Sequence, residues 1–381
     1  MADVIKDKYN CTGCAACVNI CPKQCISLKK DSEGFFYPFV DSNHCVQCHL
    51  CTSVCHCDTE IAVKQNSLGA YAAYTKDNDI LQNSSSGGVF REIAAFVLKS
   101  GGVIYGAAFT DAYTVKHIAV ESLEDIDLLQ GSKYLQSDVG NSYSLVKQNL
   151  EIGRMILFTG TPCQVAGLRR YLKKDYDNLI TLDIVCHGVP SAEIWKKYVQ
   201  YMESLASDKV KHINFRDKTY GWQNFSVCLD FESGCQIKER FSENLFMKGF
   251  LADIYLRPSC YRCKYKTITR ISDFTLADFW GIQHVCPEME NKSGTSLCWL
   301  NTEKSKWIWE KIKEGFVYKT VDLDEALKYN SAALYSSSMP KTRDKFFELL
   351  AVSDFDKAVK AALPKQHLYQ RVFRRLKKLL K

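Results

Sequence analysis

Residues 154–205 repeat one pattern of apolar and polar positions twice. In each copy a short apolar run, typical of a buried strand, is followed by a loop and then by apolar positions at helical spacing. The strands are predicted at 154–159 and 179–185, and the helices at 165–172 and 192–205. This alternation predicts βαβ units and a parallel sheet. The loops at 160–164 and 186–191 then lie beyond the carboxyl ends of their strands, where ligands collect in open α/β sheets, so we expect Cys163 and Cys186 to lie side by side.

The pattern on either side of these units predicts a larger sheet. Past residue 210 apolar and polar positions alternate as they do in antiparallel strands. Further strands are predicted at 70–74, 103–109, 210–216, 224–231, 235–241 and 296–301, and further helices at 89–99, 242–252 and 303–313. Residues 66–362 are therefore predicted to form an α/β domain with a mixed, partly parallel sheet.

Eight cysteines in residues 11–55 form two runs of the spacing C-x2-C-x2-C-x3-C. This spacing lets one tight loop place three thiolates on three irons of a cubane, while the fourth cysteine points toward a neighbouring cluster. Two 4Fe-4S clusters are therefore predicted, in a ferredoxin-like α+β module over residues 1–65. We assign Cys11, Cys14, Cys17 and Cys55 to the first cluster, and Cys45, Cys48, Cys51 and Cys21 to the second.

A structural zinc site and a disulfide framework are the alternative uses of these cysteines. Zinc ligands usually come as separated C-x2-C pairs, and cytosolic thiols stay reduced, so the spacing favours clusters. Cys25 and Cys57 lie nearby but outside the repeat, and are interpreted as packed or spare thiols. Between the two runs, residues 35–40 are predicted to form a small hairpin.

The net charge of +7 is confined to the end of the chain. Residues 363–381 hold seven basic side chains and no acidic one, so the rest of the chain is neutral. Apolar residues recur there at helical spacing, which predicts a basic amphipathic helix. Such a helix can lie on an anionic membrane surface, dock on a partner, or pack on its own domain. It gives no reason to infer nucleic-acid binding.

Composition and the N-terminal residues limit the class of protein to which the chain can belong. With 46% hydrophobic and 12% aromatic residues, the 381-residue chain can fill a packed core. The first ten residues are polar and lead directly to Cys11, so we expect no cleavable apolar signal. No apolar run approaches the roughly 18 residues that a membrane span needs. A cytoplasmic protein is therefore expected.

A Ser/Gly loop at 83–88 stands directly ahead of the helix predicted at 89–99. Free backbone N–H groups, hydroxyls and the positive end of the helix dipole suit a phosphate at such a position. An ordinary helix N-cap explains the same residues. Farther on, Lys133 lies in the turn-rich segment 131–134, where it can meet an anionic group of a cofactor or remain in water.

Four more cysteines supply a candidate third site. Cys260 and Cys263 form a C-x2-C pair, and with Cys163 and Cys186 they make the four thiols that a third cubane needs. A zinc site from the same four, and a redox-active C-x2-C pair with the other two merely buried, remain alternatives. The remaining cysteines are assigned to the core, namely Cys228, Cys235, Cys286 and Cys298.

Taken together, these motifs resemble the coenzyme F420 hydrogenase/dehydrogenase beta-subunit family, in its bacterial form with an N-terminal two-cluster ferredoxin domain. The resemblance covers nearly the whole chain to about residue 300. It rests on the ferredoxin module followed in order by SSSGG (84–88), GSKY (131–134), GTPCQVAGLR (160–169), CHGVPS (186–191), C-x2-C (260–263) and SDFTLADFWG (272–281).

Members of this family are iron–sulfur flavoproteins, so the resemblance implies a bound FAD with a cluster close to its ring. It favours a third 4Fe-4S cluster on Cys163, Cys186, Cys260 and Cys263. It also favours phosphate binding by the Ser/Gly loop and makes several polar side chains candidate cofactor contacts. The implied cofactor-binding residues are Ser85, Ser86, Gly87, Gly88, Lys133, Thr161 and Gln164.

The expected function is that of an iron–sulfur flavoprotein oxidoreductase. Cubanes carry single electrons and a flavin carries a hydride equivalent, so clusters ending at FAD convert one into the other. A ferredoxin or redox partner subunit would exchange electrons with residues 11–55, and FAD would reduce or oxidise an organic small-molecule substrate. His187 could donate a proton at the flavin, or be held by a backbone hydrogen bond. The alternatives are a non-enzymatic electron-transfer subunit of a larger complex and a coenzyme F420 dehydrogenase proper.

Overall fold

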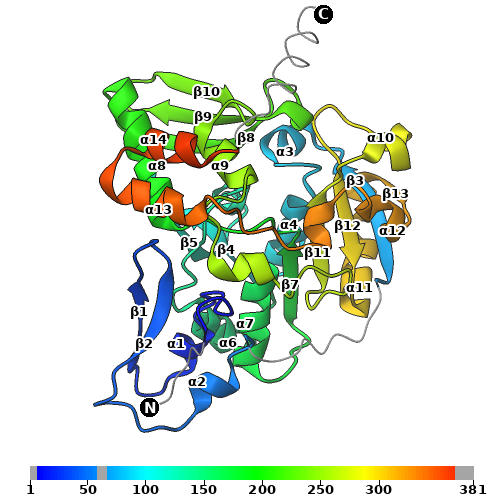
Figure 1. Ribbon diagram of the computed structural model, residues 1–381. Coiled ribbons are helices and arrows are strands. Elements are labelled where there is room, and N and C mark those ends of the chain that lie inside the picture. Colours follow the sequence, from blue (N-terminus) through cyan, green and yellow to red (C-terminus); the bar gives the residue numbers. More distant parts are fainter. Residues whose placement is uncertain (1–6, 58–66, 365–381) are drawn as a thin grey trace, which may run out of the picture.

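Figure 1 shows the computed structural model of the chain, which describes residues 7–57 and 67–364. A small cysteine-bearing module, drawn in blue, lies against a larger α/β body. The fold class predicted from the sequence is confirmed, because the module is followed by a body whose largest sheet is mixed. The basic helix predicted at 363–381 lies almost wholly outside the described residues.

The module consists of two short helices and one hairpin. Its elements are α1 (Ala16–Ile20), β1 (Ile26–Lys30), β2 (Phe36–Val40) and α2 (Leu50–Ser53). β1 and β2 pair antiparallel. Both helices begin after a residue in the left-handed conformation, Ala15 at φ 60° and His49 at φ 57°. Such tight bends direct the cysteine runs around the two helix starts.

The prediction of a hairpin within residues 35–40 is wrong, because β2 is a single arm of the β1–β2 hairpin. The turn lies earlier. Asp31 accepts hydrogen bonds from the backbone N–H groups of Glu33 and Phe35, each at 3.0 Å, and Gly34 has φ +86°. Pro38 is tolerated inside β2 because a two-stranded sheet consists only of edge strands.

The body is built on an eight-stranded sheet of order β13-β3-β12-β11-β7-β6-β4-β5. The four central strands, β11, β7, β6 and β4, run parallel to one another, and the outer pairings are antiparallel. The strands are β3 (Gly69–Thr75), β4 (Val103–Phe109), β5 (Val115–Val120), β6 (Ile156–Gly160), β7 (Leu179–Ile184), β11 (Phe274–Asp278), β12 (Ser296–Leu300) and β13 (Phe316–Thr320).

Helices cover both faces of this sheet. On one face α4 (Val89–Lys99) and α11 (Glu303–Ile312) bury an apolar stripe that includes Ile93, Val97 and Trp309. On the other face α6 (Ser142–Glu151) and α7 (Pro162–Leu172) share a core with Ala16 and Val54 of the small module. The module is therefore attached through the helices that cover the parallel strands.

The body also contains a three-stranded antiparallel sheet with helices of its own. Its elements are the antiparallel strands β8 (Val210–Asp217), β9 (Ser226–Phe231) and β10 (Gln236–Arg240), with α8 (Ala192–Ala206), α9 (Leu245–Leu251), α13 (Arg343–Val352) and α14 (Phe355–Ala362). Fully buried aromatic side chains such as Trp195 and Tyr198 fill their common core. Burying each contributes about 1.5–3 kcal/mol relative to exposure.

Helix α7 begins three residues before the predicted helix, so Cys163 lies in its first turn and not in a loop. Pro162 occupies the first helical position, where its missing N–H costs nothing. The Gln164 side chain accepts a hydrogen bond from the Thr161 backbone N–H at 3.0 Å. This capping contact fixes the start of α7 directly after β6.

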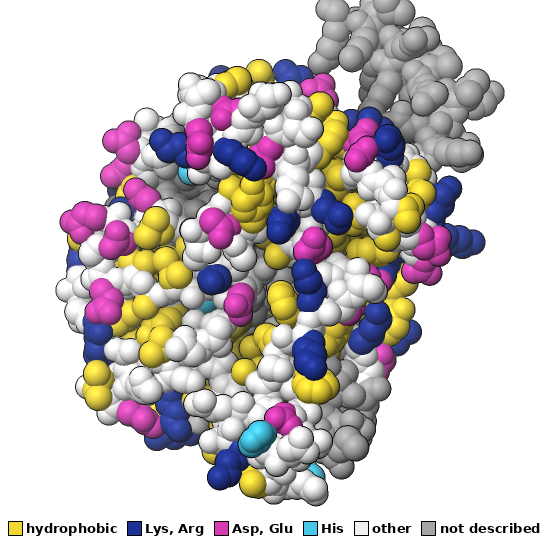
Figure 2. Space-filling model, turned by 90° about the vertical axis from the view of Figure 1, so that its left-hand side faces the viewer, with side chains coloured by type: hydrophobic (Ala, Val, Ile, Leu, Met, Phe, Trp, Pro, Cys, Tyr) yellow, Lys and Arg dark blue, Asp and Glu magenta, His cyan; other side chains and the backbone are white. Residues whose placement is uncertain are grey.

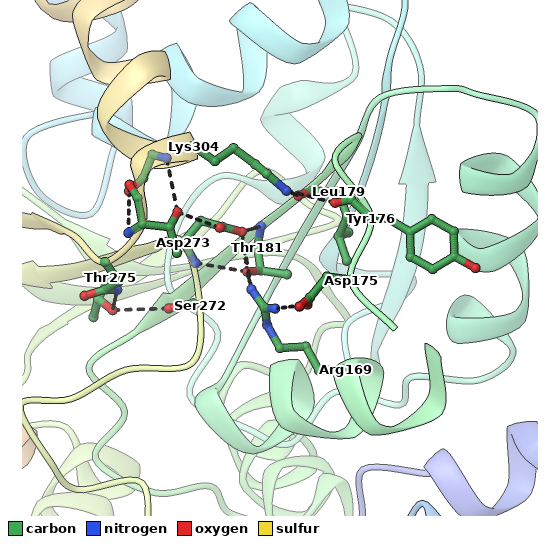
Figure 3. A network of polar contacts seen from close by, with 12 residues as sticks. Arg169, Asp175, Tyr176, Leu179, Thr181, Ser272, Asp273, Thr275 and Lys304 are labelled. Atoms are coloured by element: carbon green, nitrogen blue, oxygen red, sulfur yellow. Dashed lines mark hydrogen bonds and ion pairs between the residues drawn. The ribbon is translucent and has the colours of Figure 1, made fainter. Parts of the chain in front are cut away.

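Buried Asp273 joins the strands at the middle of the sheet (Figure 3). Its Oδ2 accepts hydrogen bonds from the backbone N–H and the hydroxyl of Thr181, both at 2.7 Å, and its Oδ1 accepts one from the Thr302 hydroxyl at 2.8 Å. Arg169 of α7 donates to the same Thr181 hydroxyl at 3.1 Å. One carboxylate thus ties β7, the start of β11 and the start of α11 together.

The surface seen in Figure 2 mixes acidic, basic and hydrophobic side chains without a continuous patch of either charge. This agrees with the neutral composition of the chain before residue 363. None of the helices in residues 7–57 and 67–364 is long and apolar enough to cross a membrane.

Candidate functional site

Two cavities in the small module gather the cysteines of the N-terminal runs. The first, of about 500 Å³ including space open to solvent, is lined by Cys11, Cys14, Cys17 and Cys55, which we call the first set. The second, of about 350 Å³, is lined by Cys21, Cys45, Cys48 and Cys51, which we call the second set. Each cavity thus takes three cysteines from one run and the fourth from the other. Ligation of iron by these residues stays a prediction.

Burial opposes ionisation of the thiols in the first set. It raises the pKa of Cys14 to about 12, and it also raises the pKa of Cys17. Iron binding must therefore displace protons that the folded chain holds tightly. Each cavity also contains one thiol from outside the repeats, Cys57 in the first and Cys25 in the second.

Buried Arg257 reaches the first set from the body. Its Nε donates to the Cys11 carbonyl at 2.8 Å, and its Nη2 lies 3.7 Å from Cys11 Sγ. Its Nη1 donates to Gln136 at 3.0 Å. Burial raises the pKa of Cys11, and the Arg257 charge opposes that shift. Arg257 was not among the predicted site residues, and its one signal in the sequence is an arginine inside the apolar stretch 254–258.

The third set comprises Cys163, Cys186, Cys260 and Cys263, and the fold brings these four together. Cys163 opens α7, Cys186 follows β7, and the other two lie in and after the 3-10 helix η2 (Pro258–Arg262). Burial raises the pKa of Cys163, and the thiols of Cys186, Cys263 and Cys260 raise it further. The predicted proximity of Cys163 and Cys186 is thus observed at the ends of two adjacent parallel strands.

The described residues contain no group of three or more His, Cys, Asp or Glu side chains arranged to hold a metal ion. A cubane is a larger body than a single ion, and its ligands stand at separate corners. The donor chemistry of the third set fits it, because four thiols and no competing carboxylate belong to the set.

Polar groups surround the third set. The Thr161 hydroxyl lies 3.1 Å from Cys163 Sγ, and the Lys266 ammonium donates to the carbonyl of Cys186. His187 Nε2 lies 2.8 Å from Asp253 Oδ1, an ion-pair distance, and its ring meets Phe250 edge to face at 4.8 Å. The Asp253 carboxylate is thus a charged neighbour of His187, and the role of His187 as a proton donor stays a prediction.

The first and third sets approach each other across α7. Gly167, one turn after Cys163, packs directly on Cys14, since a Cβ there would lie 3.0 Å from Cys14 Sγ. Tyr265 lies nearby and stays uncharged, because burial raises its pKa. Its hydroxyl lies 2.6 Å from Nδ1 of His56, and burial, with Lys264 and Arg170, lowers the pKa of His56 to about 3, so that ring is neutral.

The Ser/Gly loop contacts the GSKY segment, as a shared cofactor site requires. The hydroxyl of Ser132 donates to that of Ser85 at 2.9 Å. Ser86 donates to the Thr295 carbonyl at 2.9 Å, and the N–H of Gly87 donates to the Ser296 hydroxyl at 2.9 Å. A side chain at Gly87 would collide with the Ala73 carbonyl. Most polar groups of the loop thus fasten it to the sheet.

Gly88, the last residue of the loop, lies at the N-cap of α4 with φ +80° and gives the helix no side-chain cap. The first backbone N–H groups of α4 therefore receive no hydrogen bond from an N-cap side chain, which is a feature of anion sites at helix starts. This is the part of the loop that best suits the predicted phosphate.

Three cations border this loop. Arg216 donates to the Ser85 carbonyl at 3.1 Å and pairs with Asp278 at 2.7 Å, and Lys218 donates to the Ser86 carbonyl at 3.2 Å. Lys133 turns its ammonium toward the carbonyls of Leu129, Gln130 and Gly131. Contact of Lys133 with a cofactor anion stays a prediction.

Burial lowers the pKa of Lys133 to about 7, and burial together with the charge of Arg216 lowers the pKa of Lys218 to about 7. Neither ammonium forms an ion pair with a carboxylate in the part of the chain that the structure describes. The buried Arg216 Nε has no hydrogen-bond partner there either. Two ammonium groups outside any ion pair of the described residues, Lys133 and Lys218, fit a phosphate group. Arg216 and Lys218 were not among the predicted site residues, and their one signal in the sequence is a pair of cations at and just after the end of the strand predicted at 210–216.

Thr161 and Gln164, the other predicted cofactor contacts, are engaged in the cap of α7. Gln164 is buried and also donates to Ser137 Oγ at 2.9 Å. Their contact with a cofactor stays a prediction. Among the other cysteines, Cys228, Cys286 and Cys298 are buried as expected, but Cys235 is exposed in the β9–β10 turn, so its assignment to the core is wrong.

The fold and the cysteine sets define an iron–sulfur protein with a two-cluster ferredoxin module on a mixed α/β body. The comparison with known families is specific. Residues 10–59 match the 4Fe-4S dicluster domain, residues 70–142 the N-terminal domain of the coenzyme F420 hydrogenase/dehydrogenase beta subunit, and residues 153–326 its C-terminal domain. The chain belongs to the coenzyme F420 hydrogenase/dehydrogenase beta-subunit family, as the motifs predict.

Individual relatives are more distant. One of the subunits of the F420H2 dehydrogenase of Methanosarcina mazei is 24% identical over 195 residues, which is 48% of this chain and 54% of that protein. The chain thus spans about half the length of this relative. An uncharacterized ferredoxin of Methanocaldococcus jannaschii is 34% identical over 53 residues, 14% of this chain and 68% of the ferredoxin. A chain of the F420-reducing NiFe hydrogenase complex from Methanosarcina barkeri has a TM-score of 0.48 at 18% identity, covering 72% of this chain and 90% of that one.

Proposed function

We propose that this protein is an iron–sulfur flavoprotein oxidoreductase that relays electrons between three 4Fe-4S clusters and FAD and acts on an organic substrate. The observation that carries the proposal is that α7 carries one cysteine of the third set and contacts one of the first set. This helix holds Cys163 in its first turn and contacts Cys14 one turn later through Gly167. Clusters on the two sets would therefore be neighbours, joined through α7.

The positions of the three sets support one order of the relay. The second set lies in the module away from α7, the first set meets α7, and the third set begins at α7. Beyond the third set, the ring of His187 contacts Phe250, whose ring contacts Tyr134 of the GSKY segment at 5.1 Å. The path from the module therefore leads toward the Ser/Gly loop.

The flavin is assigned to the region between the Ser/Gly loop and the carboxyl ends of the parallel strands. The start of α4, Lys218 and Arg216 would hold its phosphates. Ile184 marks an open position there, because it is 46% exposed although β7 is a central strand. When bound, clusters supply single-electron steps and the flavin supplies two-electron chemistry.

His187 is the candidate proton donor. It follows the third-set residue Cys186, and its Nε2 lies 2.8 Å from Asp253 Oδ1, a carboxylate that can orient the ring. A histidine beside a carboxylate is suited to proton transfer. Its proton would serve the side of the flavin that faces the third set.

The electron donor or acceptor is proposed to be a ferredoxin or a redox partner protein that meets the second set. Cys48 is exposed at this end of the module, and neighbouring Val46 is 58% exposed. A cluster near the surface with an apolar residue beside it can exchange electrons with a docked protein.

Iron, sulfide and flavin analysis with low-temperature EPR on the anaerobically prepared full chain tests the proposal. Three cubanes require about 12 irons per chain, and two require about 8. C163A should lose the iron of the third cluster, whereas C235A, which removes an exposed thiol, should keep it. Full iron without flavin after reconstitution would instead support the non-enzymatic electron-transfer role.

Use of coenzyme F420 itself is the second candidate, and the F420H2 dehydrogenase among the relatives favours it. Reduced F420 added anaerobically to the flavin-loaded protein should then bleach the flavin absorbance. An unchanged spectrum would rule out F420 as the substrate, and another organic substrate would then have to be identified.

A further inference from the structure

The second cavity holds five thiols where a cubane takes four. Cys25 lines the cavity beside the second set, although it lies outside the C-x2-C-x2-C-x3-C repeat. It is 8% exposed and belongs to the same small core as Cys51. Its thiol therefore faces the place where the second cluster is proposed.

A tight turn brings Cys25 and Cys21 together. The two Sγ atoms lie 3.4 Å apart. The Gln24 N–H donates to the Cys21 carbonyl at 3.1 Å, and Gln24 adopts φ +50° to make the turn. The Cys25 carbonyl accepts a hydrogen bond from the Asp41 N–H at 2.8 Å. Cys25 directly precedes β1 and Asp41 directly follows β2, so this bond closes the open end of the β1–β2 hairpin. The proximity of the sulfurs is thus fixed by backbone contacts on both sides.

This separation has a specific meaning for a cubane. Thiolates on different irons radiate from separate corners, so their sulfurs stand well apart around the cluster. Two sulfurs in contact face the same corner and can serve only one iron between them. We propose that Cys25 is a reserve ligand for the iron that Cys21 holds in the second cluster. The inference rests on the proposed function, because it requires a cluster in the second cavity.

The exchange is a substitution at one iron. The bond between iron and Cys21 Sγ would break, a bond between iron and Cys25 Sγ would form, and the proton of the Cys25 thiol would pass to the released sulfur. No electron is gained or lost. With Cys21 bound to iron as the thiolate, the Cys25 thiol would be the donor across the 3.4 Å contact and would stabilise negative charge on the cluster.

The test compares four full-length proteins prepared anaerobically and reconstituted in parallel, namely wild type, C21A, C21A/C25A and C21A/C235A. Iron per chain and EPR of the oxidised and reduced states are measured on each. We expect about 12 irons and only four-iron signals in wild type, in C21A and in C21A/C235A. In C21A/C25A we expect about 11 irons or fewer, with either a three-iron signal in the oxidised state or loss of the second cluster.

Two outcomes would overturn the inference. One is equal loss of iron in C21A and C21A/C25A, and the other is retention of the complete second cluster in both variants. Wild type without a second cluster would remove the proposed function and the inference together. As an independent readout, C25A should keep its iron but reduce the second cluster at a more negative potential, because the hydrogen bond to the Cys21 sulfur is gone.

Discussion

Gly167 of α7 lies against Cys14 so closely that a Cβ at position 167 would stand 2.9 Å from Cys14 Cβ and 3.0 Å from its Sγ. The Tyr143 hydroxyl would lie 2.8 Å from that Cβ of residue 167. Glycine is thus required here by close packing and not by a left-handed backbone. The contact joins a ligand of the proposed first cluster to the helix that carries Cys163.

Gly167→Ala should therefore push the module away from α7. Overpacking a close contact costs about 1–3 kcal/mol, and electron transfer between the first and third clusters should slow because tunnelling falls steeply with distance. Freeze-quench EPR after rapid reduction measures the transfer. Gly315→Ala is the matched control, since a Cβ there meets nothing nearer than 3.9 Å. An unchanged transfer rate in G167A would contradict the proposed route.

Arg257 should set the potential of the first cluster. Its guanidinium beside Cys11 stabilises negative charge, so the uncharged variant R257Q should make the cluster harder to reduce. A charge-assisted contact of about 1.4 kcal/mol corresponds to a shift on the order of 60 mV for one electron. Potentiometric EPR titration measures it.

Arg343→Gln is the control for this prediction. Arg343 is also buried, but its guanidinium pairs with Glu33 of the module and donates to the Leu256 carbonyl. Its loss should reduce stability without moving the potential of the first cluster. Equal potentials in R257Q and wild type would show that the Arg257 guanidinium only supports the fold.

The parallel sheet could be predicted from the sequence because each copy of the strand–loop–helix pattern is long enough to show its period. The central strand β11 could not. Its apolar run of residues 274–277 is short and is bounded by the charged residues Asp273 and Asp278. Asp273 is buried only because Thr181 and Thr302 satisfy its carboxylate, and those partners are distant in the chain.

In the candidate site, too, some features could be predicted from the sequence and others could not. Spacing alone groups the cysteines of the first and second sets, since iron chemistry imposes it on the chain. The charges around them are not encoded by spacing. Arg257 reaches Cys11 across 246 positions of sequence, and Arg216 reaches the Ser85 carbonyl across 131. Such contacts come from tertiary packing, which local pattern does not describe.

Asp273→Asn should destabilise the body. An amide keeps the shape of the carboxylate, but its NH2 group would face the donors of Thr181, leaving buried hydrogen bonds unmade. We expect a loss of about 3 kcal/mol in the free energy of unfolding. Urea unfolding followed by tryptophan fluorescence checks this. Asp175→Asn, at the 95% exposed partner of Arg169, should change it by less than about 0.5 kcal/mol.

Flavin affinity should fall as pH rises above about 7. Burial lowers the pKa of Lys133 and of Lys218 to about 7, below the ordinary lysine value, so in the free protein both ammonium groups lose their protons as the pH passes this value. A bound phosphate favours the charged form, so binding takes up protons above pH 7 and weakens by up to about tenfold per pH unit for each lysine involved. Flavin fluorescence quenching between about pH 6.5 and 8.5 measures how the affinity changes with pH.

Two lysine variants test the assignment. K218M should bind flavin more weakly at the acidic end of this pH range, and its affinity should change less with pH. K211M, at an exposed lysine of β8, should match wild type. A pH-independent affinity in wild type would place the phosphates away from these lysines.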